Sequence, residues 1–388
     1  MTLAPSKKAL AFLGLAAAAA LTLSACAGPT TATDGGGAGK SGSDRDAPTN
    51  IEDFTAYAEE IVAEASAEQT NTAPTEGPEI VEGKKIAVIP CSMAAEGCAR
   101  PANGAVHAAE VAGWTADILD PGGDPSKMAS LIDQAVATGY DGIVLTAIDV
   151  QSVQASVQKA IDADVLVGNF AASDAEPALL TTNVPLFPED FFNAGYAMGA
   201  KMFLDQGKDM KVAMLTGTEF GSIRERLAGT KAFIDDCKAA GGGCEVVAEE
   251  NFLVTDLVTS LPGQTAAMVR SHPDANALWF GYDAGANFGI QGLEEAKLTI
   301  DTYGFDANVA NLQRIADDRG QVATAGSAMA WIGFGIIDNF NRVWAGEEVI
   351  DQGMKFKLLM ADNLPADGGA WDGDVDVEAG YKSIWGVS

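Results

Sequence analysis

The sequence is poor in histidine and in basic residues. Its 388 residues include only two histidines, His107 and His272, and 24 lysines and arginines stand against 54 acids, for a net charge of −30. Binding to nucleic acid needs Lys and Arg clustered against phosphates, so this charge argues against a nucleic-acid partner. Two histidines, neither in a nucleophile motif, leave little for a zinc centre or for Ser-His-Asp or Cys-His catalysis.

Motifs of nucleotide and hydrolase chemistry are also missing from the body of the chain. It has no nucleophile elbow and no dinucleotide glycine fingerprint, so an enzyme built on a doubly wound fold is a weak hypothesis. The composition is globular, with 47% hydrophobic and 20% charged residues. The length suits about two or three domains with a large core.

The N-terminus has the pattern of an export signal. Lys7 and Lys8 precede an apolar stretch over 9–23 that is too short to span a membrane comfortably. Leu23-Ser24-Ala25-Cys26 resembles the bacterial lipobox, which implies removal of 1–25 and lipidation of the Cys26 thiol. A buried N-terminal helix is the alternative, but the Gly- and Ser-rich stretch 27–50 favours a flexible tether. We expect an extracytoplasmic protein, lipid-anchored to the cell membrane.

The four other cysteines form two local pairs. Cys91 and Cys98 are seven positions apart, as are Cys237 and Cys244. An exported protein favours disulfides, and a four-cysteine metal site would need the C-x₂₋₄-C spacing that is absent. We predict two disulfides within these pairs.

Two short segments outside the body carry their own patterns. Phe54, Tyr57, Ile61 and Ala65 recur at helical spacing, which predicts a helix over 51–68 that docks on the main body. The acidic run 372–378 resembles a calcium loop but lacks the glycine and glutamate that an EF-hand requires at its sixth and twelfth positions. We expect a solvated acidic loop there.

From residue 84 onward, apolar runs alternate with helical patterns. We expect strands at 85–89, 115–119, 141–146, 165–167, 211–216, 245–247, 277–280 and 299–303. Helices are expected from near Pro101 and Asp124, and over 150–162, 191–205, 223–239, 262–270 and 284–296. This alternation predicts the α/β class with two doubly wound parallel-sheet lobes. Ligands of such sheets bind beyond the carboxyl ends of the strands.

Polar and aromatic residues follow these strands. They include Ser92, Asp149, Asn169, Phe170, Phe220, Arg224, Tyr282, Asp306, Ser327 and, farther along, Trp331. Planar polar groups and aromatic faces suit a polyhydroxylated ligand. Other roles compete with binding: Asp149 could cap the helix from Val150, Trp331 could be core, and Arg224 could pair with Glu219 or Glu225.

Over about 84–360 the chain resembles a type I periplasmic binding protein of the ribose/xylose-binding branch that serves ABC importers. The resemblance implies two lobes joined by a three-strand hinge, with crossings near Asn183, Ser327 and Ile350. Lobe one would comprise 84–182 plus 328–350, and lobe two 184–327 plus 351–388. Residues 26–83 would hold the lipidated cysteine, the tether and one short helix.

The resemblance also implies roles for single residues. The Gly-Thr-x₅-Arg-Glu-Arg segment is similar to a sugar-binding loop whose first arginine, here Arg224, binds the ligand, and Asp306 in Gly-Phe-Asp matches a ligand-binding aspartate. Asn169 stands where the family has an acid, Tyr282 where Asn is common, and Ser327 where a hinge Gln or Asn is usual.

Two departures make this pocket less polar than the family pattern. Phe170 stands where ribose binders have arginine, and the Cys91–Cys98 element replaces a loop of ligand contacts.

The implied function is ligand binding by hinge closure, with an ABC permease of the cytoplasmic membrane as partner and the protein as a monomer. No cofactor, metal or catalytic step is implied. The ligand implied by the resemblance is a sugar or polyol. A deoxy-sugar stays open, as does a less polar ligand or one whose carboxylate pairs with Arg224. A sensor role toward a membrane receptor also stays open.

Overall fold

The structure is a computed structural model that describes residues 46–70, 72–170, 182–183 and 188–388. The expected signal peptide, Cys26 and nearly all of the tether lie outside these ranges. Within them, no helix combines the length and apolar character that crossing a membrane requires.

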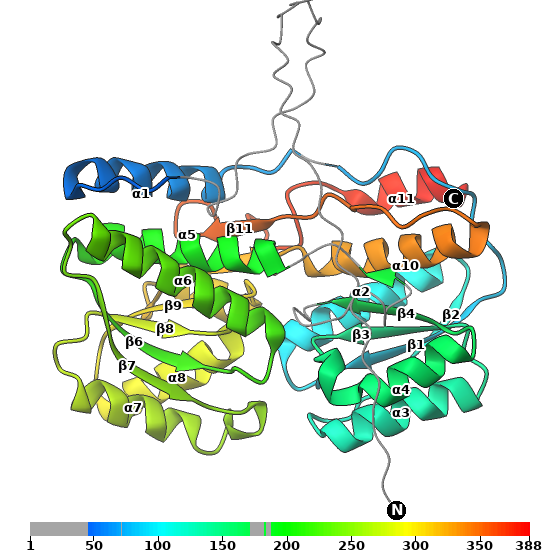
Figure 1. Cartoon of the computed structure of the whole chain (residues 1–388), viewed down its shortest axis with the longest axis horizontal. Coiled ribbons are helices and arrows are strands. Elements are labelled where there is room, and N and C mark those ends of the chain that lie inside the picture. Colours follow the sequence, from blue (N-terminus) through cyan, green and yellow to red (C-terminus); the bar gives the residue numbers. More distant parts are fainter. Residues whose placement is uncertain (1–45, 71, 171–181, 184–187) are drawn as a thin grey trace, which may run out of the picture. The chain divides into compact units, whose positions relative to one another are not determined.

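Two β-sheets organise the described chain (Figure 1). The first is parallel, in the order β2 (Thr115–Ile118), β1 (Lys85–Pro90), β3 (Gly142–Thr146), β4 (Leu166–Phe170) and β5 (Thr182–Asn183). The second has the order β11 (Phe356–Leu359), β10 (Gln321–Ser327), β9 (Asp301–Phe305), β8 (Ala277–Phe280), β6 (Lys211–Thr216) and β7 (Glu245–Asn251). Only β11 runs antiparallel to its neighbour in this sheet. The expected α/β class with two parallel-sheet lobes is confirmed.

Helices cover both faces of the first sheet. Ile86 and Val88 of β1 pack with α2 (Glu96–Val111) and α10 (Met329–Ala345), whereas Ala87 and Ile89 pack with α3 (Pro125–Ala137) and α4 (Val150–Asp162). Successive side chains of a strand point to opposite faces, so an uninterrupted apolar strand needs a layer on each side. The apolar run at 85–89 is therefore the direct cause of the layered lobe.

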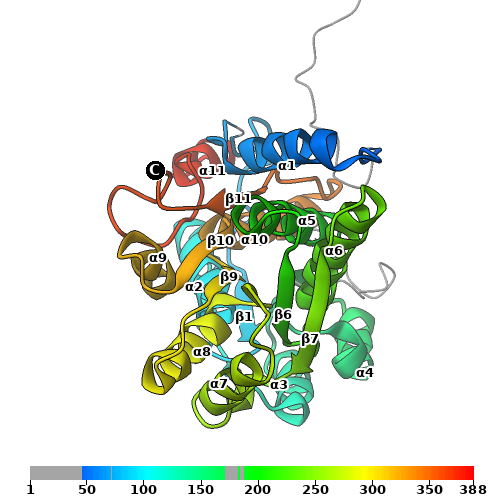
Figure 2. The same ribbon diagram turned by 90° about the vertical axis from the view of Figure 1, so that its left-hand side faces the viewer.

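The second sheet is layered in the same way. On one side lie α5 (Pro188–Gln206) and α6 (Gly221–Ala239), and on the other α7 (Leu261–Ser271) and α8 (Asp283–Ala296) (Figure 2). A 3₁₀ turn (Val254–Asp256) precedes α7, and α9 (Val309–Ala316) leads into β10. The strand expected at 299–303 begins two residues later, at Asp301 of β9. Lys297 ends α8 in a left-handed conformation, and the apolar side chains of Leu298 and Ile300 pack on the core before the strand begins.

Helix α1 (Ile51–Ser66) docks on the second lobe as expected (Figure 1). Phe54 is fully buried, with its ring centroid 5.3 Å from that of Phe203 and 5.1 Å from that of Phe233. The hydroxyl of Tyr57 lies 3.1 Å from that of Tyr196. The apolar stripe at helical spacing thus buries one face of α1 against α5 and α6.

Between β1 and β11 the chain crosses between the lobes three times. The crossings lie between β5 and α5, between β10 and α10, and between α10 and β11, so α10 covers the first sheet although the strands on either side of it belong to the second. These are the positions implied by Asn183, Ser327 and Ile350. The three-strand hinge of the fold is confirmed.

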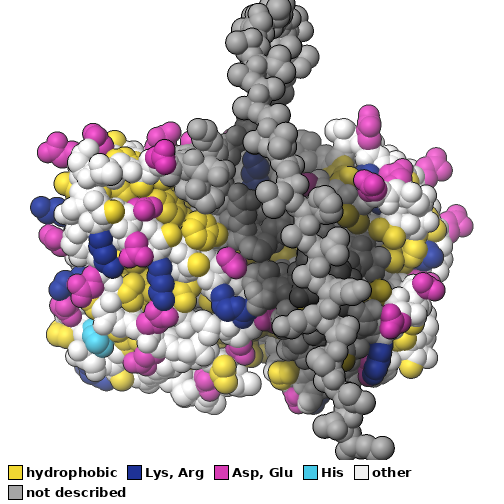
Figure 3. Space-filling view, viewed as in Figure 1, with side chains coloured by type: hydrophobic (Ala, Val, Ile, Leu, Met, Phe, Trp, Pro, Cys, Tyr) yellow, Lys and Arg dark blue, Asp and Glu magenta, His cyan; other side chains and the backbone are white. Residues whose placement is uncertain are grey.

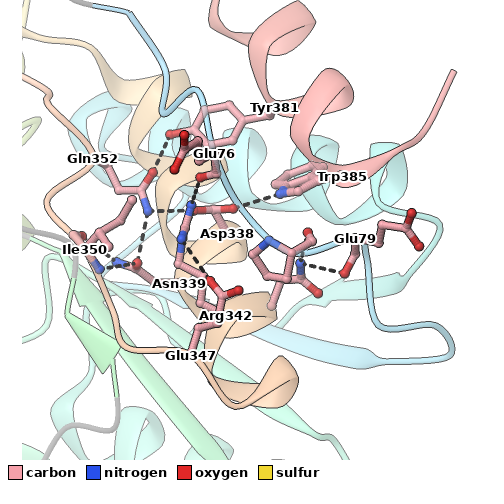
Figure 4. Close-up of polar contacts among 12 residues, drawn as sticks. Glu76, Glu79, Asp338, Asn339, Arg342, Glu347, Ile350, Gln352, Tyr381 and Trp385 are labelled. Carbon is pink, nitrogen blue, oxygen red and sulfur yellow. Dashed lines mark hydrogen bonds and ion pairs between the residues drawn. The ribbon is translucent and has the colours of Figure 1, made fainter.

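A buried polar network holds the third crossing (Figure 4). Asp338 of α10 is fully buried and forms an ion pair with Arg342 at 2.7 Å. Its carboxylate also accepts from Gln352 Nε2 and Trp385 Nε1, each at 2.9 Å, and Arg342 Nη2 donates to the carbonyl of Glu76 at 2.6 Å. A buried charge is tolerated when it is paired and hydrogen-bonded, as here. The network joins α10, the crossing, the C-terminal helix and the segment before β1.

The C-terminal segment departs from the expected partition into lobes. Of residues 351–388, β11 joins the second sheet, but α11 (Val377–Trp385) packs in the core of the first lobe. Its Tyr381 and Trp385 rings stack on Phe334 of α10, with centroids 5.3 and 5.9 Å away. Burial of this aromatic face decides the placement of the helix, and spacing along the sequence could not.

The acidic run before α11 is only partly solvated. Asp374 accepts from Lys357 Nζ and Trp371 Nε1, both at 2.9 Å, and Asp372 pairs with Arg100 at 2.7 Å. These carboxylates bind the fold itself, which corrects the expectation of a solvated loop. On the face shown in Figure 3, other acidic side chains are scattered over both lobes.

Phe54→Ala is expected to lower the free energy of unfolding by about 3–5 kcal/mol, because it removes a fully buried ring and leaves a cavity. Urea unfolding of the native protein and the variant measures the change. Glu59→Ala, at an exposed position of the same helix, is the control and should change stability little. A Phe54→Ala midpoint equal to that of the control would show that α1 does not contribute to the core.

Candidate functional site

A cavity lies where the carboxyl ends of the strands of both lobes meet. It encloses about 430 Å³ of empty space, counting the part open to solvent. The first lobe lines it with Ala95, Gly97, Cys98, Ala147, Phe170 and Met329, and the second with Phe220, Ser222, Ile223, Arg226, Tyr282 and Asp306. This is the place where parallel α/β sheets bind ligands.

Arg226 is the best-anchored polar side chain of the cavity. It is only 4% exposed, and its Nη2 donates to Asp306 Oδ1 at 2.8 Å while Nη1 donates to the carbonyl of Gly281 at 3.0 Å. Its guanidinium carbon lies 4.9 Å from the ring centroid of Phe305, within cation–π range. Its Nε is buried and finds no hydrogen-bond partner among the described residues. Arg226 thus joins α6 to the ends of β8 and β9 and keeps one donor unused.

The turn after β9 presents Asp306 in a strained conformation. Asp306 has φ 104° and Ala307 has φ 56°, backbone angles that residues other than glycine rarely adopt. Such strain persists only where neighbouring contacts hold it, and it concentrates at functional sites. Burial raises the pKa of Asp306, and the adjacent Arg226 guanidinium acts in the opposite direction.

Asp283, at the start of α8, fixes this turn through hydrogen bonds. Its carboxylate accepts from the backbone N–H of Asn308 at 3.1 Å, from Thr324 Oγ1 at 2.8 Å and from Gln321 Nε2 at 2.8 Å. Complete burial and the nearby charge of Asp306 raise the pKa of Asp283 to about 8. Asp283 is therefore a positioning residue for Asp306.

Two further buried polar side chains at the strand ends lack partners. Among the described residues, the hydroxyl of Tyr282, a residue that lines the cavity, finds no hydrogen-bond partner, and neither amide atom of Asn169 finds one. Asn169 precedes Phe170, which lines the cavity, at the end of β4. Burial raises the pKa of Tyr282 well above its usual value, so it stays a neutral phenol. Unsatisfied buried groups are costly, so each is a candidate for a ligand hydrogen bond.

Several contacts connect the lobes around the cavity. Arg224 of α6 pairs with Asp149 of the first lobe at 2.9 Å, and Asp149 also caps α4 by accepting from Gln151 N–H at 3.1 Å. Arg100 of α2 donates to the carbonyls of Asp306 and Ala307 at 2.8 and 3.1 Å. These contacts hold the two lobes together at the rim and at the α2 end of the cavity.

The expected site residues separate into three groups. Asp306, Tyr282, Phe170 and Phe220 line the cavity. Arg224 and Asp149 form the pair between the lobes, and Asn169 is buried beside Phe170.

The other three expected residues lie outside the lining. Trp331 is core and donates from Nε1 to the Tyr381 hydroxyl at 3.0 Å, Ser327 is buried at the end of β10, and Ser92 Oγ accepts from Ala94 N–H at 3.2 Å. Their ligand contacts stay predictions.

The sequence pattern missed Arg226 and Arg100. Arg224 and Arg226 are two positions apart on one helix, which puts them on nearly opposite sides of it. The Arg-Glu-Arg motif pointed to Arg224 as the ligand contact, whereas the structure places Arg226 in the cavity lining beside Asp306. Arg100 had no signal, because its partners Asp306 and Trp371 are more than 200 positions away in the sequence.

Both predicted disulfides are present, and one belongs to the cavity. The Cα atoms are 5.8 Å apart in Cys91–Cys98 and 6.1 Å apart in Cys237–Cys244. Cys98 lines the cavity, and a Cβ on the adjacent Gly97 would come within 2.7 Å of Asp306 Oδ2. The first disulfide thus closes the loop that brings the start of α2 against Asp306.

The two disulfides provide a matched comparison. Both close loops of the same length, so replacing either with alanines should cost a similar free energy of unfolding, about 2–3 kcal/mol. Only Cys91→Ala/Cys98→Ala is expected to speed amide hydrogen exchange in residues 92–100 and 305–309. Native-state exchange measured by mass spectrometry compares the two variants. Equal protection of these residues in both would contradict a role for Cys91–Cys98 in shaping the cavity.

The buried carboxyl of Asp283 is expected to make stability depend on pH. Its pKa is about 8 in the folded protein against an ordinary 3.8, so between these values only the folded state keeps the proton. Its contribution to the free energy of unfolding therefore falls as pH rises through this window and levels off above it. Asp283→Asn should be less pH-dependent than the native protein in urea unfolding at pH 5, 6.5 and 8. Equal slopes for the two proteins, with exposed Asp362→Asn as control, would contradict this.

The comparisons with known proteins come from a family model and from solved structures. The model of the periplasmic binding protein domain matches residues 86–348. No curated protein sequence matches the chain.

Many solved structures share the fold. A glucose-galactose binding protein of Geobacillus stearothermophilus is 19% identical with TM-score 0.65, covering 74% of this chain and 100% of its own. An ABC transporter solute-binding protein of Agrobacterium vitis with bound allitol is 18% identical with TM-score 0.64, covering 72% of this chain and 96% of its own. A 5-methylthioribose transporter solute-binding protein of Thermotoga lettingae is 16% identical with TM-score 0.64, covering 75% of this chain and 89% of its own. At these identities the likeness establishes the fold.

The family match covers more than half of the chain, including the strands and helices of both lobes that line the cavity. The chain therefore belongs to the periplasmic binding proteins, a family of binding proteins that act outside the cytoplasm.

Proposed function

We propose that this protein is the solute-binding component of an ABC importer and holds a small sugar or polyol between its two lobes. The observation that carries the proposal is the cavity at the strand ends, with the Arg226–Asp306 pair on its wall and the buried Tyr282 hydroxyl unpartnered. Planar polar groups beside aromatic rings suit a ring or chain with several hydroxyls.

The structural neighbours support a neutral, hydroxylated ligand. Allitol, glucose or galactose, and 5-methylthioribose are the ligands named for the three neighbours described above. The charges of this chain agree, because Arg226 pairs with Asp306 and Arg224 with Asp149. A ligand carboxylate would have to compete with those aspartates, so an acidic ligand is the weaker candidate.

Binding would work through closure of the lobes. A ligand shifts a conformational equilibrium only through contacts that are better in one state. Here the Arg224–Asp149 pair and the Arg100 hydrogen bonds to the turn at Asp306 all join the lobes, so they depend on closure. A ligand that touches both Phe170 and Tyr282 would add to them only in the closed state.

The cellular setting follows from the family and the N-terminal pattern. We propose lipidation at Cys26 after removal of 1–25, with the Gly- and Ser-rich tether leading to the folded body as a membrane-anchored monomer. Its partner would be a permease of the cytoplasmic membrane. Export agrees with the two disulfides, since such bonds persist in oxidising compartments.

A thermal-shift screen of residues 27–388 tests the proposed function, followed by calorimetry of the hits. Sugars, polyols, nucleosides, amino acids and aromatic acids are compared. A ligand of the folded state raises the melting temperature by mass action. Shifts confined to sugars or polyols are expected, and shifts confined to acids or amino acids would overturn the proposal.

Two arginines on one helix allow a matched test of the site. Arg226→Met is expected to lower ligand affinity at least about 100-fold, because it removes a buried charged donor at the cavity. Arg224→Met, which affects the rim pair, should lower it less than about tenfold. Calorimetry with a ligand from the screen measures both. The reverse order would make Arg224 the ligand contact.

Arg226→Met also leaves Asp306 unpaired in the interior, which threatens folding. Tyr282→Phe tests the site without this risk to folding, since it removes only a hydroxyl that has no partner among the described residues. It should cost about tenfold or more in affinity without loss of stability. Tyr140→Phe, at a residue outside the cavity whose hydroxyl donates to Asp117, is the control. Unchanged affinity in Tyr282→Phe would remove this hydroxyl from the site.

A further inference from the structure

The walls of the cavity differ sharply between the lobes. All four polar side chains among its described lining residues come from the second lobe: Ser222, Arg226, Tyr282 and Asp306. The first lobe lines the cavity with two alanines, a glycine, a disulfide-bonded cysteine, Phe170 and Met329. A ligand between them therefore meets one polar wall and one apolar wall.

The polar side chains of the first lobe near the apolar wall either bind other protein groups or lie beside the cavity without lining it. Thr146, at the end of β3, donates its hydroxyl to the carbonyl of Cys98 at 3.1 Å. Asp149 caps α4 and pairs with Arg224. Among the described residues, Arg100 Nε and both amide atoms of Asn169 are buried without a partner, and neither residue lines the cavity. The described first-lobe residues that line the cavity thus offer no side-chain partner to a row of ligand hydroxyls.

The apolar wall penalises a fully hydroxylated ligand. A hydroxyl buried against Ala147, Phe170 or Met329 would lose its water without gaining a partner, which lowers the affinity. A methyl or thioether group at the same place would instead gain contact with the Phe170 ring and the flexible Met329 side chain. The two walls together select a ligand with one polar and one apolar side.

We propose that the ligand is an amphipathic neutral carbohydrate, with its hydroxylated edge against Arg226, Asp306 and Tyr282 and a deoxy or alkylthio end against Phe170, Met329 and Ala147. This rests on the proposed function and names the substrate class of that same site. The polar wall carries no net charge to attract an ion, because its cation and its carboxylate form a pair 2.8 Å apart.

Matched pairs of ligands test the proposal on the unmodified protein (27–388). Calorimetry compares ribose with 5-deoxyribose and with 5-methylthioribose, and galactose with its 6-deoxy form, D-fucose. In at least one series, the deoxy or alkylthio member is expected to bind about tenfold or more tightly than the parent sugar. If each parent binds as tightly as its derivative, the inference is overturned and the proposed function stands. If no carbohydrate or polyol binds, the proposed function fails first.

Two variants locate the preference on the apolar wall. Ala147→Ser places a hydroxyl on the first-lobe side and should reduce the ratio of affinities between derivative and parent. Ser222→Ala, on the polar wall, should weaken both members alike and leave the ratio unchanged. A ratio that responds to Ser222→Ala but not to Ala147→Ser would overturn the assignment of the walls. Because the ligand pairs need no variant, the test survives if either variant fails to fold.

Discussion

The buried ion pair between Arg226 and Asp306 is the constraint on which the site depends. Two charges in an interior are costly to desolvate, and contacts with their remaining donors and acceptors offset part of that cost. Arg226 donates to the carbonyl of Gly281 and lies over two aromatic rings, with its Nε left unpartnered among the described residues. Asp306 sits in a left-handed turn that Asp283 holds. The ends of β8 and β9 and the start of α6 are thereby fixed relative to one another, and this corner forms the polar wall of the cavity.

The first lobe contacts that corner through the Arg100 side chain, through Gly97 and through apolar groups. Arg100 donates to the carbonyls of the turn, and Gly97, which has no side chain, lets the Asp306 carboxylate approach. The Cys91–Cys98 disulfide closes the loop that positions both residues. The same approach leaves Phe170 and Met329 facing the polar wall across the cavity. Closure of the lobes, retention of the buried pair and the two-sided character of the pocket thus have one structural origin. The Asp338 network supports them from a distance, because it holds the third crossing of the hinge.

Much of this architecture could be predicted, and the reasons are local. The run at Ile86–Ile89 is apolar at every position, which requires a layer on each face of the strand. Asp124-Pro125 starts α3 and Asp149 starts α4, since their side chains accept backbone N–H groups there. Short loops between cysteine pairs predicted both disulfides. Asp306, Tyr282, Phe170 and Phe220 were found because they follow strands, and the carboxyl ends of parallel strands meet at one edge.

What the sequence by itself determined was therefore what depends on near neighbours: most of the strands and helices, the disulfides, the docking stripe of α1 and many of the residues that follow strands. Only the tertiary structure decided which arginine of Arg-Glu-Arg enters the cavity, that Arg100 reaches a turn 206 positions away, and that α11 packs on the first lobe. The physical reason is that these outcomes depend on which surfaces meet once both lobes have formed. Burial of charged and aromatic groups between distant segments leaves no periodic signal along the chain.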